Sequence, residues 1–78
     1  MITIDATKIT DEMKDIMDQN EHLFTTPKQV WTTKDLNEVI YRLINLYDGT
    51  NKKDNGCGGC RTTAVTKARH IYAEYKRQ

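Results

Sequence analysis

The segment Asn55–Thr63 combines residues that favour the binding of an anion. It reads Asn-Gly-Cys-Gly-Gly-Cys-Arg-Thr-Thr. Its glycines let backbone N–H groups approach a ligand without a Cβ in the way, and Arg61 offers a planar guanidinium suited to phosphate or carboxylate. A helix that begins here adds unpaired N–H groups and the positive end of its dipole. The segment therefore predicts a site for a phosphate-containing small molecule.

The predicted site also takes in residues on either side of this segment. The full set of expected ligand-binding residues is Asn51, Lys52, Lys53, Gly56, Gly58, Gly59, Arg61, Thr62 and Thr63. The spacing is not that of a Walker motif, because no Lys-Ser/Thr pair closes it. If the guanidinium contacts the ligand, Arg61→Ala weakens binding more than Lys67→Ala, since Lys67 lies over a turn further along the helix.

Cys57 and Cys60 leave three other interpretations of the same segment open. They could be half of a zinc site, but His22 and His70 are the only further Cys or His side chains, and His70 lies about 15 Å along the helix that Cys60 opens. We therefore expect no metal within one chain, although two chains could share a site with four cysteine ligands. A Cys-x-x-Cys pair at a helix start also resembles a thioredoxin-type redox pair, but no β-α-β pattern accompanies it. The third interpretation is a tight turn with two small buried thiols.

Composition and charge limit the classes of function. The chain has 78 residues, enough for one domain, 1–78. Residues 1–50 carry five Lys/Arg and nine Asp/Glu, whereas residues 51–78 carry seven and two. These halves can neutralise each other within the fold or between copies, or the basic half can meet an anion.

Several classes of function have no signature in this sequence. No Ser-His-Asp set, readable carboxylate pair or His-Glu-x-x-His motif occurs, so we expect no enzymatic activity and no cofactor. No apolar stretch is long enough to span a membrane, and we expect no sequence-specific nucleic-acid binding. Residues 1–5 lack the features of a signal peptide, which indicates an intracellular protein with reduced cysteines.

Apolar periodicity predicts three helices. The first follows a Thr10 cap, carries Ile9, Met13, Ile16 and Met17 on one stripe, and ends near Asn20, with a loop up to Thr26-Pro27. The second, capped by Thr32 or Thr33 and stopped by Gly49, has the stripe Leu36, Val39, Ile40, Leu43, Ile44 and Tyr47, with Asn37, Glu38, Arg42 and Asn45 on its other face. The third runs from about Cys60 to Lys76 with the stripe Ala64, Val65, Ala68, Ile71, Tyr72 and Tyr75.

These elements predict an all-α fold, in which the second and third helices form an antiparallel hairpin beside the shorter N-terminal helix. That helix is too short to cover both apolar stripes, so we expect homo-oligomerisation to complete the fold. Ile2 and Ile4 could form one short strand or an arm that packs on another copy. Trp31 is interpreted as a core or interface anchor.

The run Leu46–Lys53, then Gly56-Cys57-Gly58-Gly59-Cys60-Arg61 and a basic helix, resembles small uncharacterised proteins of tailed bacteriophages. The resemblance covers about residues 46–76 and implies a viral origin. It implies three roles: a binder that sequesters a nucleotide signal of host defence, a structural or interaction component of the virion, or an inhibitor of a host protein. The first places the protein in the host cytoplasm, and we favour it over the virion role and over a zinc- or thiol-dependent interaction module.

Overall fold

The N-terminal third of the chain forms short helices, and the first two begin at side-chain caps. The computed structural model describes residues 3–25, 32–54, 56 and 58–77. Asp5 caps the 3-10 helix η1 (Ala6–Lys8), and the Thr10 hydroxyl accepts from the Met13 N–H at the start of α1 (Asp11–Gln19), which confirms the predicted cap. The loop predicted after Asn20 is wrong in part, because α2 (Glu21–Thr25) follows directly and buries two large apolar side chains.

Residues 33–48 form one continuous helix in three parts, which we call the middle helix. It consists of α3 (Thr33–Asp35), η2 (Leu36–Tyr41) and α4 (Arg42–Asp48). The Thr32 hydroxyl accepts from the Asp35 N–H at its start, and Gly49 ends it with a left-handed φ of 73°, as predicted. The π-helical geometry of η2 was not predicted. A π segment bonds residue i to residue i+5, so it widens the turn and rotates the residues on each face.

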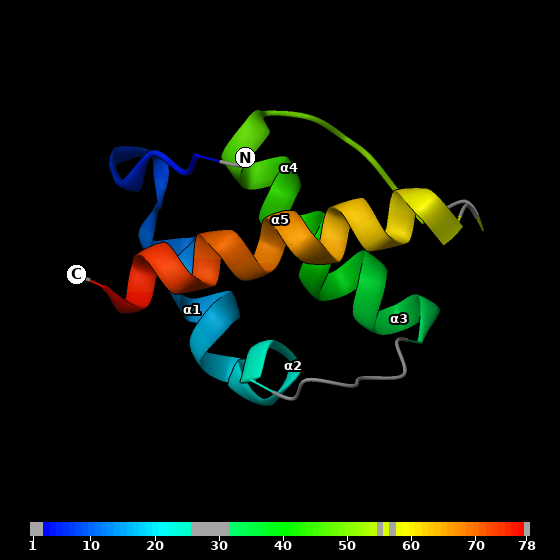
Figure 1. The fold of residues 1–78 in the computed structure, drawn as a ribbon, viewed down its shortest axis with the longest axis horizontal. Helices are drawn as coiled ribbons and strands as arrows, with labels where there is room; N and C mark the ends of the chain where they lie inside the picture. Colours follow the sequence, from blue (N-terminus) through cyan, green and yellow to red (C-terminus); the bar gives the residue numbers. More distant parts are fainter. Residues whose placement is uncertain (1–2, 26–31, 55, 57, 78) are drawn as a thin grey trace.

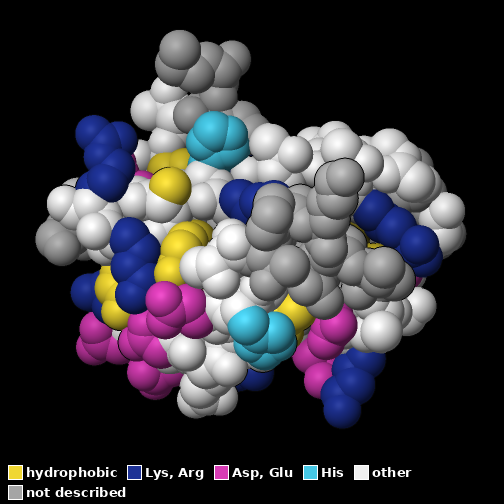
Figure 2. Space-filling model, turned by 60° about the horizontal axis from the view of Figure 1, so that its bottom comes forward, with side chains coloured by type: hydrophobic (Ala, Val, Ile, Leu, Met, Phe, Trp, Pro, Cys, Tyr) yellow, Lys and Arg dark blue, Asp and Glu magenta, His cyan; other side chains and the backbone are white. Residues whose placement is uncertain are grey.

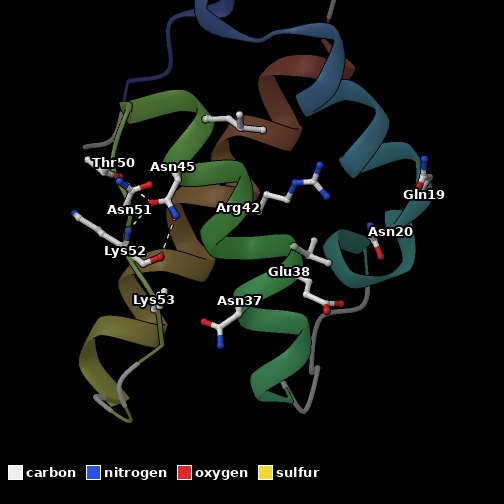
Figure 3. Close-up of a pocket in the computed structure, with 12 residues that line it drawn as sticks. Gln19, Asn20, Asn37, Glu38, Arg42, Asn45, Thr50, Asn51, Lys52 and Lys53 are labelled. Atoms are coloured by element: carbon white, nitrogen blue, oxygen red, sulfur yellow. Dashed lines mark hydrogen bonds between the residues drawn. The ribbon is translucent and has the colours of Figure 1, made fainter.

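The chain then turns back along the middle helix. The Asn45 side chain accepts from the Lys52 N–H (2.9 Å) and donates to the Lys52 carbonyl (3.0 Å). Nearer the start of the same helix, the Asn37 side chain accepts from the Asp54 N–H (2.8 Å). Figure 3 shows Asn45 and Asn37 on the side of the helix along which this segment passes. Residues 50–54, the return strap, thus bring the chain back towards the beginning of the middle helix.

Because the strap runs back, α5 (Gly58–Lys76) starts beside the first half of the middle helix and crosses it obliquely, running in the same general direction (Figure 1). Arg61, near the start of α5, meets Asp54 beside Asn37, while Lys67, further along, meets Asp48 at the far end of α4. The predicted antiparallel hairpin is therefore wrong. On the polar face of the middle helix, Asn37 and Asn45 hold the strap.

Helices from the whole chain share one apolar core. The buried side chains are Ile9, Met13, Ile16, Met17, Leu23, Phe24, Leu36, Val39, Ile40, Tyr41, Leu43, Ile44, Ala64, Ala68 and Ile71. Together α1 and α2 cover the predicted stripes, so the apolar surface that was expected to drive self-association is largely buried within one chain. Homo-oligomerisation stays a prediction. Ile4 packs against the same chain's core and lies in no strand, and Ile2, Pro27 and Trp31 fall outside the described residues.

Opposite charges from the two halves of the sequence meet within the fold. Lys67 pairs with Asp48 (2.7 Å), and Lys76 lies 4.0 Å from Glu21. On the face in Figure 2, acidic side chains gather beside lysine and arginine side chains. Part of the charge asymmetry is thus neutralised internally. No helix among the described residues has both the length and the apolar character needed to cross a membrane.

Candidate functional site

A groove of about 900 Å³ lies between the middle helix, the return strap and the first half of α5. The middle helix supplies one wall, the strap supplies two lysines, and α5 supplies the opposite wall. The lining residues are Tyr41, Ile44, Asp48, Lys52, Lys53, Gly59, Cys60, Thr63, Ala64 and Lys67. Four of the nine residues predicted from the sequence, Lys52, Lys53, Gly59 and Thr63, therefore lie together here.

The groove carries an excess of positive charge, with three lysines against one aspartate. The Lys67 Nζ donates to both carboxylate oxygens of Asp48 (2.9 and 2.7 Å), which balances its charge. Within the described part of the chain, Lys52 and Lys53 form no ion pair, and both are exposed. An anion that enters the groove therefore meets two lysines that need not first leave a carboxylate.

The groove also has an opening beside the first turn of α5. A Cβ added at Gly59 would meet no atom within 4 Å, so this stretch of wall is open space. The first N–H groups of a helix lack intrahelical partners and carry the positive end of its dipole. Both features favour a negatively charged group at this end of the groove.

Arg61 does not project into the groove, contrary to the role expected for it. Its Nε and Nη2 donate to the two carboxylate oxygens of Asp54 at 2.8 and 2.7 Å, a bidentate pair. The Asp54 side chain is 2% exposed, and the Gly56 N–H donates to it as well (3.2 Å). These hydrogen bonds, those from Arg61 above all, hold the pKa of Asp54 below its usual value and raise the pKa of Arg61.

The Asp54–Arg61 pair therefore joins the end of the strap to α5. The chain's own carboxylate occupies the guanidinium fork that the sequence suggested for a ligand. Gly56, with a φ of 84°, supplies the tight turn that lets its N–H reach Asp54. Arg61 and Gly56 thus position the strap, and through it Lys52 and Lys53.

Three other predicted residues have different surroundings from those expected. The Thr62 and Thr63 hydroxyls donate to the carbonyls of Gly58 (3.1 Å) and Gly59 (3.0 Å) within α5, so neither hydroxyl proton is available to a ligand in this state. Thr62 and Gly58 line neither the groove nor the hollow described next. A Cβ at Gly58 would meet nothing within 4 Å, so no steric contact requires a glycine at this position.

A second hollow lies on the other side of the strap, and Asn51, Lys52 and Lys53 border it too (Figure 3). It is lined by Gln19, Asn20, Asn37, Glu38, Val39, Arg42, Asn45, Leu46 and Thr50–Lys53. Arg42 forms an ion pair with Glu12 (3.0 Å), and two of the lining asparagines hold the strap. Its polar groups are thus largely engaged in structure, so we place the candidate site in the groove.

The cysteine interpretations are only partly testable, because Cys57 lies outside the described residues. Cys60 is exposed and disulfide-bonded, which contradicts the expectation of a reduced, buried thiol at this position. Within the described ranges, no three His, Cys, Asp or Glu side chains lie close enough to hold a metal ion.

Tyr41 is the groove residue that the sequence did not indicate. It lies outside the 3.6-residue stripe of its helix, yet it is 5% exposed and lines the groove. In a π-helical turn, residues five apart come onto one side, which brings Tyr41 towards the buried side of Leu36.

Comparison of the chain with protein-family models, curated proteins and solved structures gives no match.

Proposed function

We propose that the protein is a non-enzymatic binder of a phosphate-containing small molecule, which the groove holds between the return strap and α5. The observation that carries the proposal is the placement of Lys52 and Lys53, two lysines without carboxylate partners among the described residues, opposite the first turn of α5. Lysine is a point charge with three donors, which suits phosphate oxygens from several directions.

The ligand-binding set in this proposal differs from the one expected from the sequence alone. Lys52, Lys53 and the backbone near Gly59 contact the ligand, and Lys67 contributes at the far end of the groove. Arg61 acts indirectly, by holding Asp54 and the strap. Lys67→Ala should therefore weaken ligand binding directly, while Arg61→Ala should act through the stability of the strap.

The resemblance to small phage proteins gives the proposal its most concrete form. In this form the protein sequesters a nucleotide immune signal in the host cytoplasm, without converting it. A binder of this kind needs a charged groove and no catalytic group, which agrees with the lysines of the groove and with the absence of a catalytic signature in the sequence.

Calorimetric titration of the full chain with linear and cyclic nucleotides tests the proposal. The double variant Lys52→Gln/Lys53→Gln should weaken binding by about tenfold or more, because charge-assisted hydrogen bonds to phosphate are lost. Lys34→Gln is the matched control, since Lys34 is an exposed lysine on α3 that lines neither hollow. Equal losses in the double variant and the control would contradict the proposal, and so would a folded wild type that binds no nucleotide. The second result would favour a protein-interaction role in the virion.

A further inference from the structure

Cys60 brings a disulfide to the edge of the groove. It is the third residue of α5, it is exposed, and it is disulfide-bonded. It lines the groove together with Lys52 and Lys53. The only other cysteine of the sequence, Cys57, lies outside the described residues. Exposed disulfides are reduced more readily than protected ones, so the disulfide of Cys60 is open to attack by a thiol from solvent.

The charges around Cys60 favour such an attack. Thiol–disulfide exchange begins with an attacking thiolate and releases another thiolate, so positive charge near the sulfur assists it. Lys52 and Lys53 form no ion pair within the described ranges. The carboxylate that lines the groove, that of Asp48, is balanced by Lys67. An anionic thiol that approaches Cys60 through the groove therefore meets net positive charge.

Other contacts already hold the strap and the start of α5 in place. The Asp54–Arg61 pair joins the strap to α5, and Asn45 fixes the strap to the middle helix. A disulfide between cysteines three positions apart closes a short loop, and the stabilisation from loop closure is smallest for short loops. The disulfide of Cys60 is therefore better suited to chemistry than to holding the fold.

We propose that Cys60 undergoes thiol–disulfide exchange with a low-molecular-weight thiol whose carboxylates are attracted by Lys52 and Lys53. Glutathione is a thiol of this class. The inference goes beyond the proposed function, because it assigns covalent chemistry to a groove that otherwise only binds. It also uses a sulfur atom to which the binding of a phosphate gives no role.

The exchange has two steps. The thiolate of the small molecule attacks the Cys60 sulfur, a new S–S bond forms, and the electron pair of the broken S–S bond leaves on the cysteine that was bonded to Cys60. A second small-molecule thiolate then attacks the mixed disulfide, which releases the small-molecule disulfide and leaves Cys60 as a thiolate. Two small thiols are oxidised and one protein disulfide is reduced, and the two thiol protons pass to the two cysteines.

The test compares an anionic with a cationic thiol on the oxidised full chain. Glutathione and cysteamine are each added to the wild type and to Lys52→Gln/Lys53→Gln, and the reduced fraction is followed by alkylation and mass spectrometry. Each rate constant is divided by the thiolate fraction of the thiol. The double variant should slow reduction by glutathione about three- to tenfold more than reduction by cysteamine, because attraction between exposed charges is lost.

Lys34→Gln is the matched control and should leave both rates unchanged, since Lys34 lines neither hollow. Equal effects of the double variant on the two thiols would overturn the inference. So would a disulfide that glutathione reduces only after the chain is unfolded in urea. Either result leaves the proposed function standing, because nucleotide titration tests that function separately. Failure of nucleotides to bind would likewise leave the exchange site standing.

Discussion

The return strap depends on Asn45, so Asn45→Ala should destabilise the fold measurably. One side chain makes three hydrogen bonds: its Nδ2 donates to the Lys52 carbonyl (3.0 Å), and its Oδ1 accepts from the Lys52 N–H (2.9 Å) and the Thr50 hydroxyl (2.8 Å). At about 1 kcal/mol net for each bond, the loss is about 3 kcal/mol. Alanine recovers about 0.6 kcal/mol through its higher helix propensity. The expected change in the free energy of unfolding is therefore about 2 kcal/mol.

For a domain of this size, a change of that magnitude lowers Tm by about 8–16 °C. Urea and thermal unfolding followed by circular dichroism at 222 nm measure both quantities. Asn51→Ala is the matched control, because Asn51 is exposed in the same strap and its side chain makes no hydrogen bond among the described residues. We expect that control to stay within about 0.5 kcal/mol of wild type. A change in Asn45→Ala as small as this would refute the role assigned to the asparagine.

Three further predictions follow from the groove and the strap. The hydrogen bonds from Arg61 lower the pKa of Asp54, so their contribution to stability is complete above about pH 4 and is lost as the pH falls through the lowered pKa. In an acid titration followed by circular dichroism, Asp54→Asn should therefore lose less stability than the wild type. Equal losses of stability would contradict this. Gly59→Leu should leave the fold intact and abolish nucleotide binding by filling the groove, whereas Gly58→Leu should leave both intact, as measured by thermal unfolding and calorimetry. Self-association predicts a mass above that of the monomer by light scattering at micromolar concentration, and a monomer mass would contradict it.

The helices could be predicted from local signals. Thr10 and Thr32 offer hydroxyl caps, Gly49 permits a left-handed stop, and apolar side chains at spacings of three and four mark the buried faces. Each of these signals acts over a few residues, so it can be recognised without knowledge of the rest of the fold.

The path between the helices could not be predicted in the same way. The loop predicted over Thr50–Gly59 suggested a hairpin, whereas the chain runs back along the middle helix because Asn37 and Asn45 bond to its backbone. Asparagine on a helix surface is usually solvated, so its type and spacing gave no sign of this role. The helix α2 was missed for a related reason, since its five residues are too few to show a period.

The candidate site, like the fold, could be predicted only in part. Lys52, Lys53 and Gly59 line the groove, but residue type alone could not show that Asp54 occupies the Arg61 guanidinium. Tyr41 was missed because the predicted stripe assumed 3.6 residues per turn, and the π-helical turn of η2 moves this side chain into the groove wall. An intramolecular partner and an irregular turn both depend on the tertiary fold.

Calorimetric titration of the wild-type chain with nucleoside monophosphates, at low and at high salt, tests the central claim most directly. The account predicts saturable binding of one ligand per groove that weakens as salt is added, because the exposed lysines of the strap contribute through charge that salt screens. A folded sample that shows no saturable heat at low salt, or binding that salt leaves unchanged, would contradict it.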